Sequence, residues 1–392
     1  MRKVFHTGTH RVRHPDDTLT AILPLLPDFG VTRLADVTGL DDLNIPVVMS
    51  VRPTATTLSV SQGKGTTLTL ARISAAMEAI ELWHAERAVP AVTQHATSAA
   101  ALDLSYDVTG LEQHPGSLLT QHTRLDWIPA TILPTGQPTL VPVSAVHMGQ
   151  HTTTAWRPYL RSGSSNGLAS GNTIAEATIH ACYEAIERDA TSILATSPIA
   201  DRDHLDPASV VDDACRSIID RIHAACAWLE LVHIPNRWQI PCFACYLWRD
   251  DTASCMVVGS GAHSDPAVAL SRAITEAVQS RLTFITGTRD DIHPAIYTPG
   301  TYHPPASTTP TRSWPDITAA YTRTFDSDDA EATWLAEHLS AGGSPPLRVV
   351  LADRPEFAVV KVLCPGLAYT ARHEIPRPVG RAARNGVLGG TR

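Results

Sequence analysis

The sequence predicts an α/β or α+β fold in which helices pack on mixed or antiparallel sheets. Three stretches, about a hundred residues apart, each place glycines directly before a helical pattern. Short apolar or alternating runs between these stretches are typical of strands. Because the period is too long for a solenoid, we interpret the self-similarity as a pseudo-repeated core of glycine-loop and helix units.

Residues 1–55 are expected to form an N-terminal segment that precedes the repeated core. Its first helix should begin at an aspartate, which is a good N-cap, and should end at a proline and a glycine. The expected elements are a helix at 18–26, capped by Asp16 or Asp17 and ended by Pro27 and Gly30, and a strand at 47–51.

The first unit has the sequence SQGKGTTLTLARISAAMEAIELWHAE and continues to about Ala88. Its glycines are predicted to lie in a loop, and a helix without proline follows them. The loop would contain Gly63, Lys64 and Gly65, and the helix would carry Ser74, Glu78 and Glu81.

The second unit spans 165–190, with Gly167 and Gly171 in the predicted loop and Asn172 or Thr173 as the expected N-cap. Its helix places four polar residues at i, i+4, i+8 and i+11, which is one helix face. Carboxylates within three turns repel each other. The neighbouring Arg188 cannot balance them alone, so a positively charged partner is expected. A solvated acidic face is the alternative interpretation, and recurrence of the pattern in the other units argues against it. The four residues are Glu176, His180, Glu184 and Glu187.

The third unit places Gly259 and Gly261 in a predicted loop and Glu276 and Gln279 on the helix that follows. The spacing from glycine to glutamate is thirteen residues for Gly65–Glu78, thirteen for Gly171–Glu184 and fifteen for Gly261–Glu276.

Outside the units, residues 91–126 are polar and poorly periodic, which is typical of a surface excursion. Residues 287–314 are rich in proline, and both a disordered linker and an ordered lid fit this segment. The remaining expected elements are strands at 127–133, 140–143, 231–234, 242–248, 254–258, 347–351 and 358–363, and a helix that begins at Ser327, continues to about Leu339 and ends at Gly342 and Gly343.

Composition narrows the function classes. The chain has 392 residues, 43% hydrophobic and 18% charged, and a net charge of −8, which gives no electrostatic footprint for nucleic acid or an anionic membrane. No signal-peptide pattern and no apolar run long enough to span a bilayer is present. The seven cysteines have no disulfide-framework spacing. We therefore expect a cytoplasmic protein with reduced thiols.

Carboxylates from several helices, together with basic side chains and glycine-rich backbone, suit a polyphosphate held through Mg²⁺, because Mg²⁺ prefers carboxylate and phosphate oxygens. Lys64 is well placed for a phosphate group. The GKGTT run lacks the spacing of a P-loop, and GSG at 259–261 is no dinucleotide fingerprint. A set of purely structural ion pairs is the alternative interpretation.

The motifs SQGKG…SAAMEAIE, SNGLASGNT…EATIHACYEAIERDA, EAVQSRL…GTRDD and CPGL at 364–367 resemble the YcaO family from about residue 30 to the end. The resemblance implies a YcaO domain at 56–392 that binds ATP and Mg²⁺ and phosphorylates a backbone amide oxygen of a peptide. A nucleophile then adds and phosphate leaves. No individual catalytic side chain is assigned.

The resemblance also implies a set of site residues. The implied Mg²⁺ ligands are Glu78, Glu81, Glu176, Glu184 and Glu187. The implied nucleotide contacts are Ser74, Asn172, Arg188, Gln279 and Arg281, with Arg289 as a further contact and Lys64 added from its chemistry.

One departure from the family pattern concerns the terminal PxPxP of many cyclodehydratases, because Pro376 and Pro378 form only one PxP. The chain is expected to resemble the stand-alone members, without a fused adenylate-forming or peptide-clamp domain. Those members make azolines or macrocyclic amidines, or install thioamides beside a TfuA-type partner. The expected partner is a ribosomally made precursor peptide, a homodimer is left open, and a non-catalytic accessory protein is the rival from another class.

Two other features have less specific interpretations. Cys242 and Cys245 have metal-like spacing, but in a strand they would point to opposite faces, so a metal site is disfavoured. His180 could be a metal ligand, although a hydrogen-bonded or packing role is favoured.

Overall fold

The structure, a computed structural model, describes residues 1–6, 8–113, 116–149, 164–250, 256–289, 292, 302–303, 308–369 and 380–381. Helices pack on antiparallel sheets, which confirms the α+β form of the predicted fold class. Every pairing between named strands is antiparallel. No helix within the described ranges is long and apolar enough to span a membrane.

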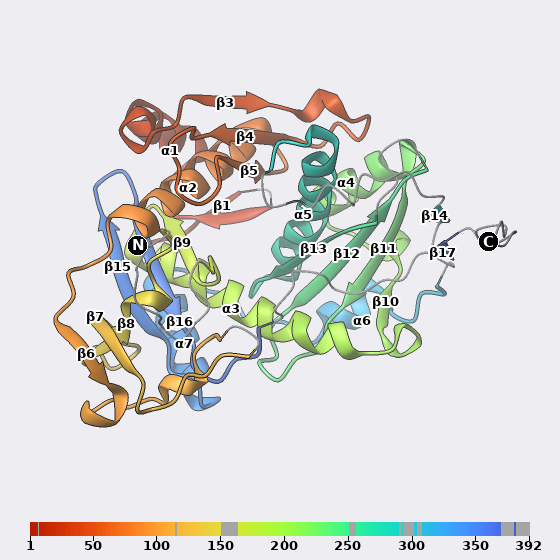
Figure 1. The fold of residues 1–392 in the computed structure, drawn as a ribbon. Coiled ribbons are helices and arrows are strands. Elements are labelled where there is room, and N and C mark those ends of the chain that lie inside the picture. The colour runs from red at the N-terminus through yellow and green to blue at the C-terminus, as the bar shows by residue number, and fades with distance from the viewer. Residues whose placement is uncertain are drawn as a thin grey trace, which may run out of the picture.

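The strands form three main sheets and two small two-stranded sheets (Figure 1). The first sheet has the order β3 (Arg33–Asp36), β4 (Val47–Val51), β5 (Val60–Lys64). The second has the order β6 (Gln94–Ser98), β7 (Arg124–Ile132), β15 (Leu347–Asp353), β16 (Ala358–Leu363), β9 (Leu168–Gly171), and β8 (Pro138–Pro142) also pairs with β7. The third has the order β10 (Asp203–Leu205), β11 (Trp228–His233), β12 (Cys242–Trp248), β13 (Val257–Ala262). The small pairs are β1 (Val4–His6) with β2 (Thr9–Arg11), and β14 (Tyr302–His303) with β17 (Gly380–Arg381).

Three long helices, α2, α3 and α5, follow the edge strands β5, β9 and β13 and pack on them. Each helix also contacts the edge strand of the next unit, so that α2 touches β9, α3 touches β13 and α5 touches β5. The three units therefore close into a ring around a pseudo-three-fold axis. The α-helices of the described residues are α1 (Pro15–Ile22), α2 (Leu68–Arg87), α3 (Ile174–Thr196), α4 (Asp213–Ala224), α5 (Pro266–Thr286), α6 (Trp314–Thr318) and α7 (Asp328–Ala341).

The glycines that precede these helices lie mainly in the strands, which corrects the prediction of glycine loops. A Cβ on Gly63 would lie 2.0 Å from the backbone nitrogen of Ala75, and a Cβ on Gly261 would lie 2.2 Å from the carbonyl oxygen of Ala269. Glycine is required because the helix backbone lies directly against the strand. The glycines thus serve helix–strand packing.

The structure also corrects the register of the repeat. Gly63 lies against helix residues eight and twelve positions further on, and Gly261 does the same. In this register Gly63, Ala169 and Gly261 are equivalent, and a glutamate follows fifteen residues later in all three copies, at Glu78, Glu184 and Glu276.

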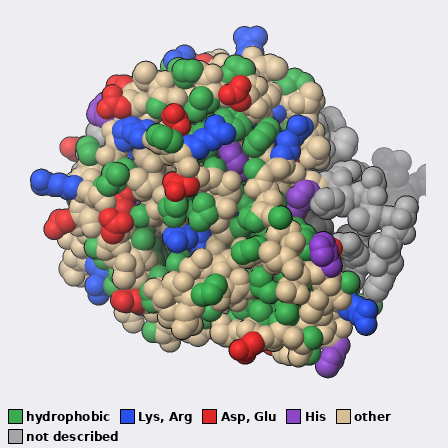
Figure 2. All heavy atoms as spheres, turned by 90° about the vertical axis from the view of Figure 1, so that its left-hand side faces the viewer, with side chains coloured by type: hydrophobic (Ala, Val, Ile, Leu, Met, Phe, Trp, Pro, Cys, Tyr) green, Lys and Arg blue, Asp and Glu red, His purple; other side chains and the backbone are tan. Residues whose placement is uncertain are grey.

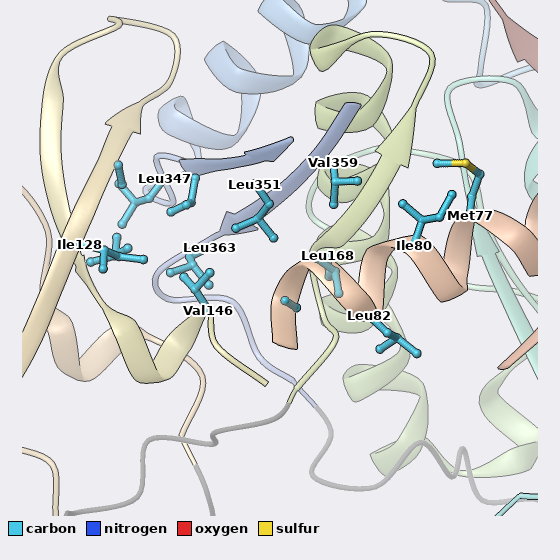
Figure 3. Close-up of a cluster of buried hydrophobic side chains, with 14 of the residues drawn as sticks. Met77, Ile80, Leu82, Ile128, Val146, Leu168, Leu347, Leu351, Val359 and Leu363 are labelled. Atoms are coloured by element: carbon cyan, nitrogen blue, oxygen red, sulfur yellow. The ribbon is translucent and has the colours of Figure 1, made fainter. Parts of the chain in front are cut away.

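The core explains why some strands are apolar without alternation. On β12, Cys242 contributes to the cluster beneath α3, while Cys245 contributes to the cluster beneath α5, so both faces of the strand are buried. The two cysteines therefore point to opposite faces, as predicted. In a third cluster, side chains of α2 meet those of β9, β15 and β16 (Figure 3). Its members in the figure include Met77, Ile80, Leu82, Leu168, Leu351 and Val359.

Several predicted boundaries are confirmed and others shift. The strands at 47–51, 242–248 and 358–363 and the N-cap Ser327 lie where the sequence predicts them. The first helix instead begins at Pro15 with His14 as its N-cap, because proline is favoured at the first helical position. Strand β13 begins at Val257 and includes the glycines, and residues 251–255 lie outside the described residues.

One larger segment differs from the prediction, and another lies mostly outside the residues that the structure describes. The predicted surface excursion at 91–126 contributes β6, which pairs with β7 and extends the second sheet. Most of 287–314, and the PxP at 376–378, lie outside the described residues. The β4–β5 pairing crosses the predicted domain boundary at residue 55.

On the face shown in Figure 2, acidic and basic side chains are interspersed.

The close helix–strand contact leads to a stability prediction. Gly261→Ala should lower the free energy of unfolding by about 2 kcal/mol or more, because its Cβ meets backbone rather than a movable side chain. Gly39→Ala is the control, since nothing lies within 4 Å of its added Cβ. Urea denaturation midpoints measure both, and equal midpoints for the two variants would contradict the packing role.

Candidate active site

A cavity of about 1170 Å³ lies among the three units, lined by α2, α3, α5, their edge strands and the N-terminal segment. A pocket of this size can hold more than one small ligand. It brings together all but one of the predicted site residues: Lys64, Ser74, Glu78, Glu81, Asn172, Glu176, Glu184, Glu187, Arg188, Gln279 and Arg289.

The pseudo-symmetry arranges the cavity wall in three layers. Helix residues four and three positions apart share one face, so equivalent positions of the three helices point toward the same axis. The layers, each with one residue from α2, α3 and α5, are Ser74, His180 and Arg272; Glu78, Glu184 and Glu276; and Glu81, Glu187 and Gln279.

The third layer connects each helix to the next unit. Edge strands present unpaired backbone and polar groups, and these helix side chains satisfy some of them. The contacts follow one cyclic order: Ser170 Oγ of β9 donates to Glu81 at 2.5 Å, Ser260 Oγ of β13 donates to Glu187 at 2.6 Å, and Gln279 Nε2 donates to the Gln62 carbonyl of β5 at 3.1 Å.

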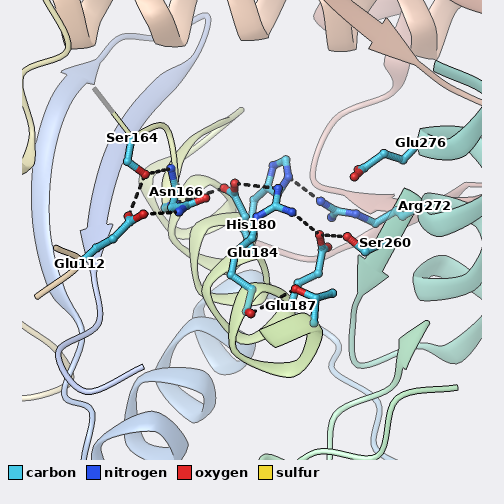
Figure 4. Close-up of polar contacts among 12 residues, drawn as sticks. Glu112, Ser164, Asn166, His180, Glu184, Glu187, Ser260, Arg272 and Glu276 are labelled. Carbon is cyan, nitrogen blue, oxygen red and sulfur yellow. Dashed lines mark hydrogen bonds and ion pairs between the residues drawn. The ribbon is translucent and has the colours of Figure 1, made fainter. Parts of the chain in front are cut away.

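Basic side chains partly balance the carboxylates. Lys64 on β5 forms an ion pair with Glu276 on α5. Arg188 lies 3.6 Å from Glu184 and 3.5 Å from Glu187. Figure 4 shows Glu187 on α3 directed toward Ser260 of the third unit, with Arg272 and Glu276 on the same side of the site.

The pKa values of the cavity glutamates show that negative charge is in excess. Burial raises the pKa of Glu78 to about 7, although Arg289 and Lys64 oppose the shift. Burial, together with Glu78 and Glu184, raises the pKa of Glu81 to about 8. Burial also opposes ionisation of Glu276, but Lys64 and Arg188 outweigh it, so its pKa is lowered. The side of the cavity formed by α2 therefore carries more carboxylate than the nearby cations can neutralise.

Glu176 is held by donors from two directions. The amide nitrogen of Asn172 donates to both of its oxygens, at 3.0 and 3.2 Å. Arg11 on β2 lies 3.3 Å from one oxygen, and the Val12 N–H donates to the other at 3.1 Å. The N-terminal segment is thereby tied to the cavity, and the role of Glu176 as a Mg²⁺ ligand stays a prediction.

Arg281 is the predicted site residue that the structure places elsewhere. Its side chain is buried and its Nε lies 2.7 Å from Asp41, away from the cavity lining. It is two residues from Gln279 and therefore lies on a different face of α5.

The cavity residues absent from the predicted set include three that contact or neighbour its charged groups: Arg11, Arg272 and Glu276. Equivalence to Glu78 and Glu184 could have identified Glu276, whereas Arg11 reaches the cavity only through the tertiary fold.

The donor set fits Mg²⁺, although it is not a preassembled metal centre. Within the described residues, no three His, Cys, Asp or Glu side chains are arranged to hold one ion by themselves. Mg²⁺ in phosphate sites usually takes one or two carboxylates and completes its shell with phosphate oxygens and water. The spread of Glu78, Glu81, Glu184 and Glu187 around the cavity matches that requirement. His180 instead contacts Arg272, 2.7 Å from its Nη2.

A water-accessible cavity ringed by carboxylates and a few cations, built from three repeated units, defines a protein that binds a polyanion together with hard cations. The model of the YcaO family, described as a cyclodehydratase that binds ATP and Mg²⁺, matches residues 62–368, and the chain belongs to this family.

Relatives and solved structures agree with this assignment. An uncharacterised protein of Mycobacterium tuberculosis strain H37Rv is 38% identical over 96% of this chain and 86% of its own length. A protein encoded in the tfuA 3′ region of Rhizobium leguminosarum bv. trifolii is 38% identical over 72% of this chain and 69% of its own length. The YcaO protein of Methanopyrus kandleri, solved with AMPPCP and Mg²⁺, has the same fold, with a TM-score of 0.67, 23% identity, and coverage of 92% of this chain and 94% of that one.

The raised pKa of Glu81 leads to a prediction about the metal-free protein. The unfolded chain ionises this group near pH 4.5 and the folded chain near pH 8, so stability falls as pH rises between these values. Glu81→Gln should therefore melt a few degrees higher (~2 °C or more) than the wild type at pH 9, and at nearly the same temperature at pH 4.

Melting curves in EDTA without nucleotide provide the measurement. Glu337→Gln, at an exposed position on α7, is the matched control and should change neither value. A lower melting temperature for Glu81→Gln at pH 9 would refute the electrostatic account.

Proposed function

We propose that this chain uses Mg-ATP to phosphorylate a backbone amide oxygen of a ribosomally made peptide, after which a nucleophile of the same peptide closes an azoline or macroamidine ring. The observation that carries the proposal is the convergence of two carboxylate pairs on one cavity. Glu78 and Glu81 come from α2, Glu184 and Glu187 come from α3, and Lys64 and Arg188 lie beside them.

The reaction has two balanced stages. First, the amide oxygen forms a bond to the γ-phosphorus of ATP, and the bond between that phosphorus and ADP breaks. Second, a thiol, hydroxyl or amine of the peptide adds to the amide carbon and loses its proton. Phosphate then leaves with the electrons of the carbon–oxygen bond, and the amide nitrogen releases its proton as a carbon–nitrogen double bond forms. The peptide loses the atoms of one water, and the oxygen departs in phosphate.

Such chemistry needs positioning and charge neutralisation more than a protein nucleophile. Bound Mg²⁺ would supply most of the neutralisation. The chain's own residues hold the opposing charges in place: Ser170 and Ser260 fix Glu81 and Glu187 by hydrogen bonds, and Arg188 bridges Glu184 and Glu187. The cavity volume of about 1170 Å³ leaves room for a nucleotide and a peptide segment together.

Thioamide formation is the second candidate. In that reaction sulfide, supplied from outside the peptide, would displace the phosphate, and a TfuA-type protein would act as partner. The observation in its favour is the 38% identity to a protein encoded in the tfuA 3′ region of R. leguminosarum bv. trifolii. A non-catalytic accessory protein is the remaining rival, and it would require neither nucleotide binding nor turnover.

Nucleotide binding gives the first functional prediction. Glu184→Gln keeps the size of the side chain and removes one negative charge from the cavity. It should weaken Mg²⁺-dependent binding of AMPPCP about 10-fold or more and abolish ATP turnover, since a lost ligand costs at least as much as a lost supporting residue. Isothermal titration calorimetry measures the binding, and Glu337→Gln on the exposed face of α7 is the control. Unchanged binding and turnover in Glu184→Gln would favour the accessory protein.

The reaction itself is predicted from the mass of the product. Incubation of a precursor peptide encoded beside this gene with the protein, ATP and Mg²⁺ should remove one water per modified site. Intact-mass spectrometry detects this loss, and Glu184→Gln should leave the peptide unchanged. Exchange of one oxygen for sulfur, seen only after sulfide and a TfuA-type partner are added, would replace ring formation with thioamidation.

A further inference from the structure

Arg272 projects from α5 into the cavity beside the carboxylates of the site. Figure 4 shows its side chain between Glu276 and the Ser260–Glu187 pair and directed toward His180 on α3. Arg272 and His180 occupy equivalent positions of the third and second units. The pseudo-symmetry therefore brings these two residues together across the axis.

The contact between them fixes the protonation of the histidine. Nη2 of Arg272 lies 2.7 Å from Nε2 of His180. A guanidinium group can only donate hydrogen bonds, so Nε2 must accept and the imidazole must be neutral. Burial, followed by Arg272, Arg11 and Lys64, holds the pKa of His180 well below its usual value, in agreement with this assignment. The backbone of Ser170 acts in the opposite direction on this pKa but does not outweigh these groups.

The neutral partner sets Arg272 apart from the other basic residues near the axis. Lys64 pairs with Glu276, Arg188 pairs with Glu184 and Glu187, and Arg11 pairs with Glu176. Across the described part of the chain, no salt bridge between Arg272 and a carboxylate is formed. The imidazole thus orients the guanidinium without cancelling its charge, which a glutamate at the same position would do.

We propose that Arg272 is the cation that binds phosphate oxygens of the nucleotide in this cavity, and that His180 is the positioning residue that holds it there. The inference rests on the proposed function for the identity of the anion. It adds Arg272 to the predicted nucleotide contacts and gives His180 a supporting role. The guanidinium uses one N–H for His180 and keeps the others for a bidentate contact with phosphate.

The energetic setting of Arg272 supports this role. Burial lowers its pKa and nearby Arg11 adds to the shift, although Glu187 and Glu276 oppose it. A partly desolvated cation without a direct counterion is destabilising in the empty protein. Anionic oxygens that arrive in the cavity relieve this cost, so the free energy of ligand binding includes the recovered interaction.

The test is a double-mutant cycle that measures the dissociation constant of Mg-AMPPCP. Arg272→Gln should weaken binding about 10-fold or more, as expected for a lost hydrogen bond to a charged group. His180→Phe removes the acceptor and should weaken binding several-fold, whereas His180→Gln keeps an acceptor and should bind nearly as the wild type does. If His180 acts through Arg272, the double variant His180→Phe/Arg272→Gln should bind no more weakly than Arg272→Gln alone.

Two controls make each outcome decisive. Arg216→Gln on α4 removes an arginine outside the cavity and should leave binding unchanged, and melting temperatures verify that every variant is folded. Wild-type binding by Arg272→Gln, or additive losses in the double variant, would overturn the inference while the proposed function stands. Failure of the wild type itself to bind Mg-AMPPCP would instead overturn the proposed function.

Discussion

Repulsion among buried carboxylates is the constraint on which the rest of this structure depends. Glutamates from α2, α3 and α5 face one axis. Burial raises the pKa of Glu78 to about 7 and that of Glu81 to about 8. A fold can keep such a cluster only if its framework is rigid and the cost is small against the total stability. The three sheets and their apolar clusters supply that framework, and the unbalanced charge is what gives the cavity its affinity for cations and, through them, for an anion.

The framework holds the carboxylates close because the backbones approach closely. Glycine or alanine at equivalent strand positions lets each helix lie directly on its strand, where any larger side chain would push the helix and its glutamates away from the axis. Each helix then contacts the strand of the next unit through Glu81, Glu187 or Gln279. Each repeat therefore supplies both the strand residues that pack against the helix and the helix residues that line the cavity.

Much of this could be predicted from the sequence, because helix periodicity and internal repeats are local properties. The glutamates at 78, 81, 184 and 187 were expected on one cavity from spacing and family resemblance, and they line one cavity. The prediction that the glycines lie in loops is wrong. A glycine before a helix gives the same sequence pattern whether it lies in a turn or in a strand that contacts the helix. Arg11 and Arg272 were missed because their relation to Glu176 and His180 exists only across units. Arg281 lies outside the cavity for a similar reason, since its partner Asp41 is 240 residues away in sequence.

Closure of the ring has a consequence for synthesis of the chain. The contact of Gln279 with the carbonyl of Gln62 joins residues 217 positions apart. During translation, β5 leaves the ribosome long before α5. The cavity-facing edge of β5 therefore stays exposed until the third unit has been synthesised. Contacts this distant in sequence slow folding, and an uncovered strand edge is the kind of surface that pairs with other chains. A nascent or truncated chain that lacks α5 consequently has neither a complete nucleotide cavity nor a protected first sheet. We expect chaperones to bind such a chain at the exposed edge of β5.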